Sequence, residues 1–224
     1  MSTLELTSHP LCPFNQRLII TLLMKGLKRN QDFSVKYIDL ANIPDRFKTI
    51  SPKGEMPVLK TDETYLFKTN PINEYLNEYG SGNLHSENTI EKAQERYWVE
   101  YSGTILNKLR DLFTAKDRSV FNRDVEALFD LLQPVENHLD EHSNYWRNQH
   151  YTLVDGAFLP AFTLIFHFKY FKNHAAWTRF PKTLFWANSL LKTRFYRDSI
   201  CPNFDEEFNH FFELTNSSFK EFTE

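Results

Sequence analysis

The first eighty residues alternate between short apolar stretches and longer apolar blocks, which predicts a small α/β unit. Residues 4–7 alternate apolar and polar side chains, as a half-buried strand does. Residues 18–24 are almost continuously apolar and lead to Gly26, a residue typical of helix ends. Residues 33–39 alternate again and are rich in strand formers. Two strands flanking a helix indicate a βαβ unit with a right-handed crossover.

The next segments extend this unit. Residues 43–50 are polar and mixed, which predicts a short helix. Residues 57–59 and 65–67 are short apolar runs joined by a tight turn, and together they predict a β-hairpin. Residues 68–71 open a further helix that ends near Gly80. The predicted order is βαβαββα around a mixed four-stranded sheet.

The remainder of the chain follows a helical period almost everywhere. Residues 90–113 carry one long apolar stripe, and residues 125–139 carry a second. Thr152 and Asp155 have the spacing of a capping box. Residues 157–171 follow it and are apolar nearly all round, which predicts a buried central helix.

The end of the chain adds a predicted helix at residues 180–191 and then a tail in which six phenylalanines lie among acidic residues. Such a tail either folds over a pocket or packs on a partner, because left exposed it would be a sticky apolar patch. The whole pattern predicts two domains, an α/β domain at 1–80 and an all-α domain at 90–224, joined by a linker at 81–89.

Composition excludes several classes of function. The 224 residues carry a net charge of −3 with no basic block, so no nucleic-acid partner is expected. The most apolar later stretch, 156–168, is too short to span a bilayer, and the N-terminus lacks the pattern of a signal peptide. Two cysteines, Cys12 and Cys201, provide no disulfide framework. We therefore expect a cytoplasmic protein that acts in a reducing compartment, away from membranes.

The candidate chemistry lies at Cys12, between the first strand and the first helix. Pro13 suits the first helical position, because its missing N–H would have no partner there. Cys12 is then expected near the N-cap, facing unpaired N–H groups and the positive end of the helix dipole. A thiol placed there loses its proton more easily, and the thiolate is the nucleophile. The alternative is that Cys12 is a small buried residue, as free cysteines usually are.

His138 and His142 are four residues apart, a spacing that can place two metal ligands on one helix face. No third ligand is evident near them in the sequence. A solvated helix face is the simpler interpretation, and no metal site is predicted.

Four features follow one another in a fixed order along the chain. They are Cys12-Pro13-Phe14-x-Gln16-Arg17, then Ser51-Pro52-x-Gly54-x-x-Pro57-Val58-Leu59, then the turn and hairpin, and then the helical half with its capping box. Together they resemble a cytosolic glutathione S-transferase. The cysteine at the first helix is similar to the omega and dehydroascorbate-reductase branch, whereas other members carry a tyrosine or serine hydroxyl there.

This resemblance implies a thioredoxin-like N-terminal domain, an all-α C-terminal domain and the glutathione S-transferase fold. It implies glutathione as co-substrate, no metal, and a homodimer formed through the third and fourth helices. Cys12 would be the catalytic nucleophile. The residues that would bind glutathione are Phe14, Met56, Pro57, Lys68 and Thr69. Met56-Pro57 would be a cis peptide, with the Met56 backbone paired to the cysteinyl part of glutathione.

The lack of a second cysteine nearby selects the chemistry. Asn15 occupies the place of the resolving cysteine in dithiol motifs. Cys12 would therefore form a mixed disulfide with glutathione, which a second glutathione releases. The expected function is a glutathione-dependent thiol transferase or reductase that acts on a small electrophile or disulfide. Deglutathionylation, dehydroascorbate reduction and reductive removal of glutathione from conjugates are the candidate reactions.

Two positions depart from the family pattern. An acid and a serine usually start the third helix, and here the pair is Lys68-Thr69, which reverses a charge near the γ-glutamyl ammonium. Ala41 stands where omega-type proteins tend to have lysine. These departures keep open a non-catalytic, partner-binding protein with weakened glutathione affinity. A conjugating glutathione S-transferase is the third hypothesis, although a thiol replaces the usual activating hydroxyl.

Overall fold

A computed structural model of the chain describes residues 4–62, 64–147 and 149–223. Its N-terminal part contains β1 (Leu4–Ser8), α1 (Pro13–Met24), β2 (Phe33–Tyr37), α2 (Asp45–Ile50), β3 (Val58–Lys60), β4 (Tyr65–Phe67) and α3 (Thr69–Glu78). The strands form one four-stranded sheet in the order β2-β1-β3-β4. β1 runs parallel to β2 and antiparallel to β3, which pairs antiparallel with β4. The predicted βαβαββα order and mixed sheet are confirmed.

The centre of the sheet is held by apolar side chains of β1. Leu6 pairs with Val35 of β2 on one side and with Leu59 of β3 on the other. α1 and α3 pack against each other and complete a core with β1. Its buried members are Leu4, Leu6, Leu18, Ile19, Leu22, Phe33, Leu59, Ile72 and Leu76. This packing fixes the β1–α1 turn, where Cys12 lies.

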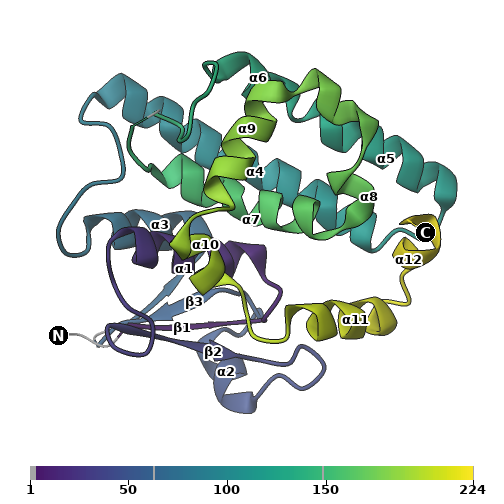
Figure 1. The fold of residues 1–224 in the computed structure, drawn as a ribbon. Coiled ribbons are helices and arrows are strands. Elements are labelled where there is room, and N and C mark those ends of the chain that lie inside the picture. Colours follow the sequence, from purple (N-terminus) through teal and green to yellow (C-terminus); the bar gives the residue numbers. More distant parts are fainter. Residues whose placement is uncertain (1–3, 63, 148, 224) are drawn as a thin grey trace.

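The C-terminal part is helical (Figure 1). It contains α4 (Thr89–Phe113), α5 (Arg118–Asp130), α6 (Gln133–His138), α7 (Leu153–His167), α8 (Lys169–Lys172), the 3₁₀ helix η1 (Ala175–Arg179), α9 (Pro181–Leu190), α10 (Arg194–Ser199), α11 (Phe204–Leu214) and α12 (Phe219–Thr223). Every residue of α7 from Leu153 to Ile165 is buried, and α7 packs on both α1 and α4. The predicted central helix is therefore confirmed. In the described part of the chain, no helix combines the length and hydropathy needed to cross a bilayer.

The capping box at the start of α7 is also confirmed. The Thr152 hydroxyl accepts from the N–H groups of Val154 and Asp155, and the Asp155 carboxylate accepts from the Thr152 N–H at 2.7 Å. Asp155 also accepts from the backbone N–H of Trp146 at 2.7 Å and from the Trp186 indole N–H at 2.8 Å. One carboxylate thus joins the start of α7 to two other segments of the helical domain.

Two helical boundaries differ from the sequence-based expectation. The stripe at 125–139 is divided between α5 and α6, because Pro134 lies in the first turn of α6 and favours a new helix start. The stretch 157–171 is divided between α7 and α8 at Phe168, which has extended backbone angles of φ −89° and ψ 123°. Apolar periodicity continued across both breaks and did not reveal them.

The segment predicted as a linker is tied to both parts of the molecule. His85 is buried, with Nδ1 2.8 Å from Glu95 and Nε2 3.1 Å from Glu74. Burial lowers the pKa of His85, but its hydrogen bonds with Glu74 and Glu95 outweigh burial and raise it. Leu84 accepts from the N–H of Leu153 at the start of α7. The division at 81–89 stays a prediction.

The phenylalanine-rich tail packs against the helical domain of its own chain. Figure 1 shows α11 and α12 (yellow) leading from the sheet toward the start of α5. Phe208, Phe212 and Phe219 are buried. Arg118 at the start of α5 donates to the carbonyl of Phe222 at 2.9 Å. Of the two expectations for the tail, it is the intramolecular one that the structure supports.

Candidate functional site

Cys12 occupies the N-cap of α1, as predicted. Pro13 follows it in the first turn of the helix. The Cys12 N–H donates to the carbonyl of His9 at 3.1 Å, and the Cys12 carbonyl accepts from the N–H groups of Asn15 and Gln16, each at 3.1 Å. The Cys12 side chain is half-buried and caps no backbone group.

The expectation that the pKa of Cys12 is lowered is wrong in direction. Burial raises the pKa of Cys12 above its ordinary value. The Ser8 hydroxyl and the N–H groups of Asn15 and Phe14 lower the pKa, and so does the positive charge of Arg17, but together they do not offset burial. The helix start thus contributes as expected, and the apolar surroundings that the sequence could not reveal outweigh it.

A pH profile of alkylation checks this direction. Because the pKa of Cys12 is raised, only a small fraction is thiolate at neutral pH. In a Cys201→Ser host, the rate of Cys12 reaction with iodoacetamide is expected to rise with pH and to reach half its maximum above pH 9.0, the ordinary value. A midpoint below about pH 8 would mean that the helix start and Arg17 dominate instead.

Cys12 lies at a cavity of about 360 Å³ between the two parts of the chain. The cavity is mainly apolar, with Arg110 of α4 contributing a charge. Its remaining lining residues are His9, Leu11, Pro13, Phe14, Leu40, Gly54, Met56, Leu106, Asn107, Phe113, Leu164, Phe208 and Phe211. The last two come from α11, so the folded tail forms one wall. Met56 precedes Pro57, and the Met56-Pro57 peptide is cis, as the resemblance implied.

A groove of about 700 Å³ adjoins this cavity and shares Phe14 and Asn107 with it. Lys68 and Thr69 line it from the start of α3, and Tyr97, Glu100 and several neighbours line it from α4. The predicted site residues thus form two adjoining groups. Cys12 and Met56 lie at the cavity, Lys68 and Thr69 lie at the groove, and Phe14 lies at both. Pro57 is buried beside Met56.

Lys68 pairs its charge with an acidic residue. Its ammonium lies 2.6 Å from a carboxylate oxygen of Glu55, and the Lys68 side chain is 67% exposed. A hydrogen bond from Lys68 lowers the pKa of the Glu55 carboxyl. The backbone of Lys68 has φ +66°, which is a strained conformation for a residue other than glycine. Thr69, the next residue, begins the helix.

Arg17 is a buried charge that lines the groove, and no role was predicted for it. Its guanidinium donates to Asn70 Oδ1 at 3.1 Å and to Ser102 Oγ at 2.8 Å. Burial lowers the pKa of Arg17 to about 10, while the charges of Glu100 and Cys12 act to raise it. A charged residue in the predicted helix, directly before the apolar run 18–24, was the sequence signal that could have drawn attention to it.

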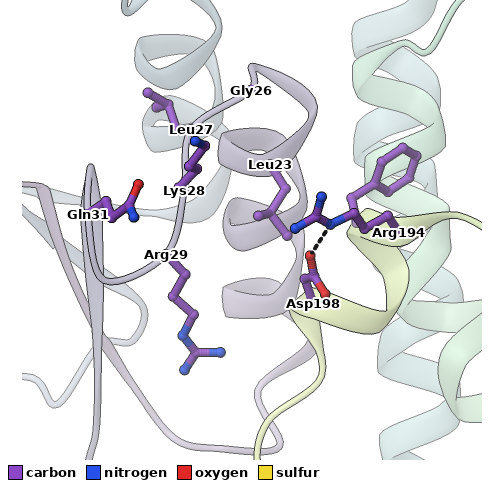
Figure 2. Close-up of a pocket in the computed structure, with 9 residues that line it drawn as sticks. Leu23, Gly26, Leu27, Lys28, Arg29, Gln31, Arg194 and Asp198 are labelled. Atoms are coloured by element: carbon purple, nitrogen blue, oxygen red, sulfur yellow. Dashed lines mark hydrogen bonds and ion pairs between the residues drawn. The ribbon is translucent and has the colours of Figure 1, made fainter.

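Other candidate features lie elsewhere. A hollow of about 600 Å³ lies between the loop after α1 and α10. Arg194 and Asp198 of α10 line it and form an ion pair at 3.1 Å; the pair can be followed in Figure 2. None of the predicted site residues lines this hollow. Cys201 is buried, and burial raises its pKa to about 11.

His138 and His142 do not share a helix face, because α6 ends at His138. His138 stacks on Trp146, with ring centroids 4.4 Å apart. Within residues 4–62, 64–147 and 149–223, no group of three or more potential metal ligands occurs.

Three comparisons place these features among known proteins. Residues 6–83 match the family model "Glutathione S-transferase, N-terminal domain". The chain is 24% identical over 188 residues to rice "Probable glutathione S-transferase DHAR2, chloroplastic", covering 84% of this chain and 63% of that protein. It is 26% identical over 153 residues to mouse "Glutathione S-transferase omega-1", covering 67% of this chain and 62% of that protein. The chain therefore spans slightly less than two thirds of the length of each of these two relatives.

The fold is also that of solved glutathione transferases. The structure of rice GST1 in complex with glutathione superposes with a TM-score of 0.80 at 18% identity, covering 96% of this chain and 97% of that one. At this identity the likeness concerns the fold, and the expected thioredoxin-like domain followed by a helical domain is confirmed.

Proposed function

We propose that the chain is a glutathione-dependent thiol transferase or reductase in which Cys12 is a monothiol nucleophile, because residues 6–83 match the glutathione S-transferase N-terminal domain and the relatives include proteins named DHAR and omega. One observation carries the proposal: a cysteine occupies the N-cap position of α1, at the edge of a cavity that Met56 of the cis Met56-Pro57 peptide also lines. Cys201 does not line that cavity and is not available there as a resolving thiol.

The proposed chemistry has two steps. Cys12 loses its proton and attacks the glutathionyl sulfur of a mixed disulfide. The bond between the two substrate sulfurs breaks, a bond from Cys12 to glutathione forms, and the departing thiolate takes up a proton. A second glutathione then attacks the glutathionyl sulfur on Cys12, which leaves free Cys12 and glutathione disulfide. One disulfide is consumed and one is formed, so no other oxidant or reductant is needed.

The residues around Cys12 have separate roles in this proposal. The Met56 backbone and the groove at Thr69 hold glutathione, with the γ-glutamyl carboxylate at the N-terminus of α3, where unpaired N–H groups favour an anion. The apolar cavity, closed on one side by Phe208 and Phe211, takes the second substrate. Deglutathionylation, dehydroascorbate reduction and removal of glutathione from conjugates all remain compatible with this assignment.

Titration calorimetry with reduced glutathione tests the proposal against the non-catalytic alternative. We expect a dissociation constant between about 1 μM and 1 mM, and much weaker binding of the dipeptide Cys-Gly, which lacks the γ-glutamyl group. The Lys68–Glu55 ion pair supports this expectation, because it removes much of the repulsion that Lys68 would exert on the γ-glutamyl ammonium. No heat of binding at several millimolar glutathione would favour a partner-binding protein.

A homodimer through α3 and α4 and a cytoplasmic location remain proposals. α4 exposes Ile90 and Tyr97, which are 70% and 57% accessible. Exposed apolar side chains of this size on one helix are consistent with burial against a second copy.

A further inference from the structure

The γ-glutamyl end of glutathione carries a carboxylate and an ammonium on the same carbon atom, so its site needs two partners of opposite charge close together. Under the proposed function, the carboxylate lies at Thr69 and the N-terminus of α3. The partner of the ammonium must then lie about one side chain away from Thr69. The first turn of α3 contains no acidic residue, so the partner has to come from another element.

Glu55 is not available for this role. Its carboxylate accepts from Lys68 at 2.6 Å, and the two charges largely cancel. Lys68 itself cannot attract an ammonium. The Lys68–Glu55 pair therefore provides no net negative charge near Thr69 to attract the γ-glutamyl ammonium.

Glu100 of α4 supplies a carboxylate on the opposite wall of the same groove. Asn70, which directly follows Thr69 in α3, donates from Nδ2 to Glu100 Oε2. The Glu100 side chain thus contacts the residue next to Thr69, where the carboxylate is proposed to bind. Its other oxygen, Oε1, makes no hydrogen bond or ion pair with the residues that the structure describes, and the residue is exposed to solvent in the groove.

The neighbouring cation does not neutralise Glu100 by direct contact. The Arg17 guanidinium donates to Asn70 Oδ1 at 3.1 Å and to Ser102 Oγ at 2.8 Å. Asn70 lies between the two charges, accepting from Arg17 and donating to Glu100. This arrangement fixes the Asn70 amide and leaves one face of the Glu100 carboxylate free for a ligand.

We propose that Glu100 binds the γ-glutamyl ammonium of glutathione, supplying from α4 the negative charge that this chain lacks at the start of α3. The proposal rests on the proposed glutathione-dependent function. It assigns a specificity: ligands with a free γ-glutamyl ammonium should be preferred over analogues in which that group is missing.

The experiment compares two ligands on two proteins by titration calorimetry. The ligands are glutathione and its deamino analogue, γ-glutaryl-cysteinyl-glycine. The variant is Glu100→Gln, which removes the charge and keeps an oxygen that can accept from Asn70. Wild type is expected to prefer glutathione by about 10-fold or more. Glu100→Gln is expected to lose about 10- to 100-fold in glutathione affinity, and to bind the analogue as wild type does.

The analogue separates recognition from support of the fold. If Glu100 acted only by holding Asn70 and Arg17, the variant would weaken both ligands equally, and that result would overturn the proposal. Glu126→Gln on α5 makes the same charge change at an exposed position outside the groove, and should leave both affinities within about 2-fold.

The two proposals fail in different ways. If wild type binds glutathione and Glu100→Gln keeps the full preference for it over the analogue, the assignment of Glu100 is wrong and the proposed function stands. If wild type binds neither ligand, the glutathione-dependent function itself is wrong, and the assignment of Glu100 falls with it.

Discussion

Replacing Cys12 with serine is expected to reduce glutathione-dependent thiol transfer by about 1,000-fold or more, because the proposed reaction passes through a bond between glutathione and the Cys12 sulfur. A serine hydroxyl is a far weaker nucleophile toward sulfur and cannot form that disulfide. The measurement is the steady-state rate with a glutathionylated thiol as substrate, in the presence of reduced glutathione.

Cys201→Ser is the matched control. Cys201 is also a free thiol, but it is buried outside the cavity at Cys12. This variant should keep activity within about 2-fold of wild type. Substantial activity in Cys12→Ser, or its loss in Cys201→Ser, would contradict the assignment of the nucleophile. Glutathione binding by Cys12→Ser, measured separately, shows that the site itself is intact.

The second large effect is expected at Asp155. Its carboxylate is fully buried and accepts from the N–H groups of Thr152 and Trp146, the Thr152 hydroxyl and the Trp186 indole. Asp155→Ala would leave these donors without that acceptor inside the helical domain and would break the capping box of α7. Lost caps and buried unsatisfied donors each cost about 1–3 kcal/mol, so we expect a destabilisation of about 3–5 kcal/mol.

Chemical denaturation of wild type and Asp155→Ala, which gives the free energy of unfolding of each, checks this effect. The control is Asp130→Ala, which removes an exposed carboxylate 3.4 Å from Arg179. A surface pair of this kind should change the free energy of unfolding by about 0.5 kcal/mol or less. A loss below about 1 kcal/mol for Asp155→Ala would show that the helical domain does not depend on this carboxylate.

Sequence patterns predicted the features that depend on neighbours along the chain. Alternation identified the strands, Pro13 placed the start of α1, and the spacing of Thr152 and Asp155 identified the cap of α7. Each of these signals lies within a few residues of the structure it predicts. The breaks within 125–139 and 157–171 were missed because apolar side chains continue across them.

Features that depend on distant contacts were not predictable in this way. Burial raises the pKa of Cys12, and the cavity beside it is lined by residues of α4, α7 and α11, which come together only in the folded chain. The Lys68–Glu55 pair bridges two segments 13 residues apart, and the Asn70–Glu100 hydrogen bond bridges 30 residues. The sequence pattern predicted Lys68 as a departure from the family, and its pairing with Glu55 became visible only in the structure.

Mass spectrometry of the intact protein after incubation with glutathione disulfide tests the central claim most directly. We expect the mass of one glutathionyl group to be added, to map to the peptide containing Cys12, to disappear on addition of reduced glutathione, and to be absent from Cys12→Ser. No adduct on wild type, or an adduct only on Cys201, would contradict the account of Cys12 as a monothiol nucleophile.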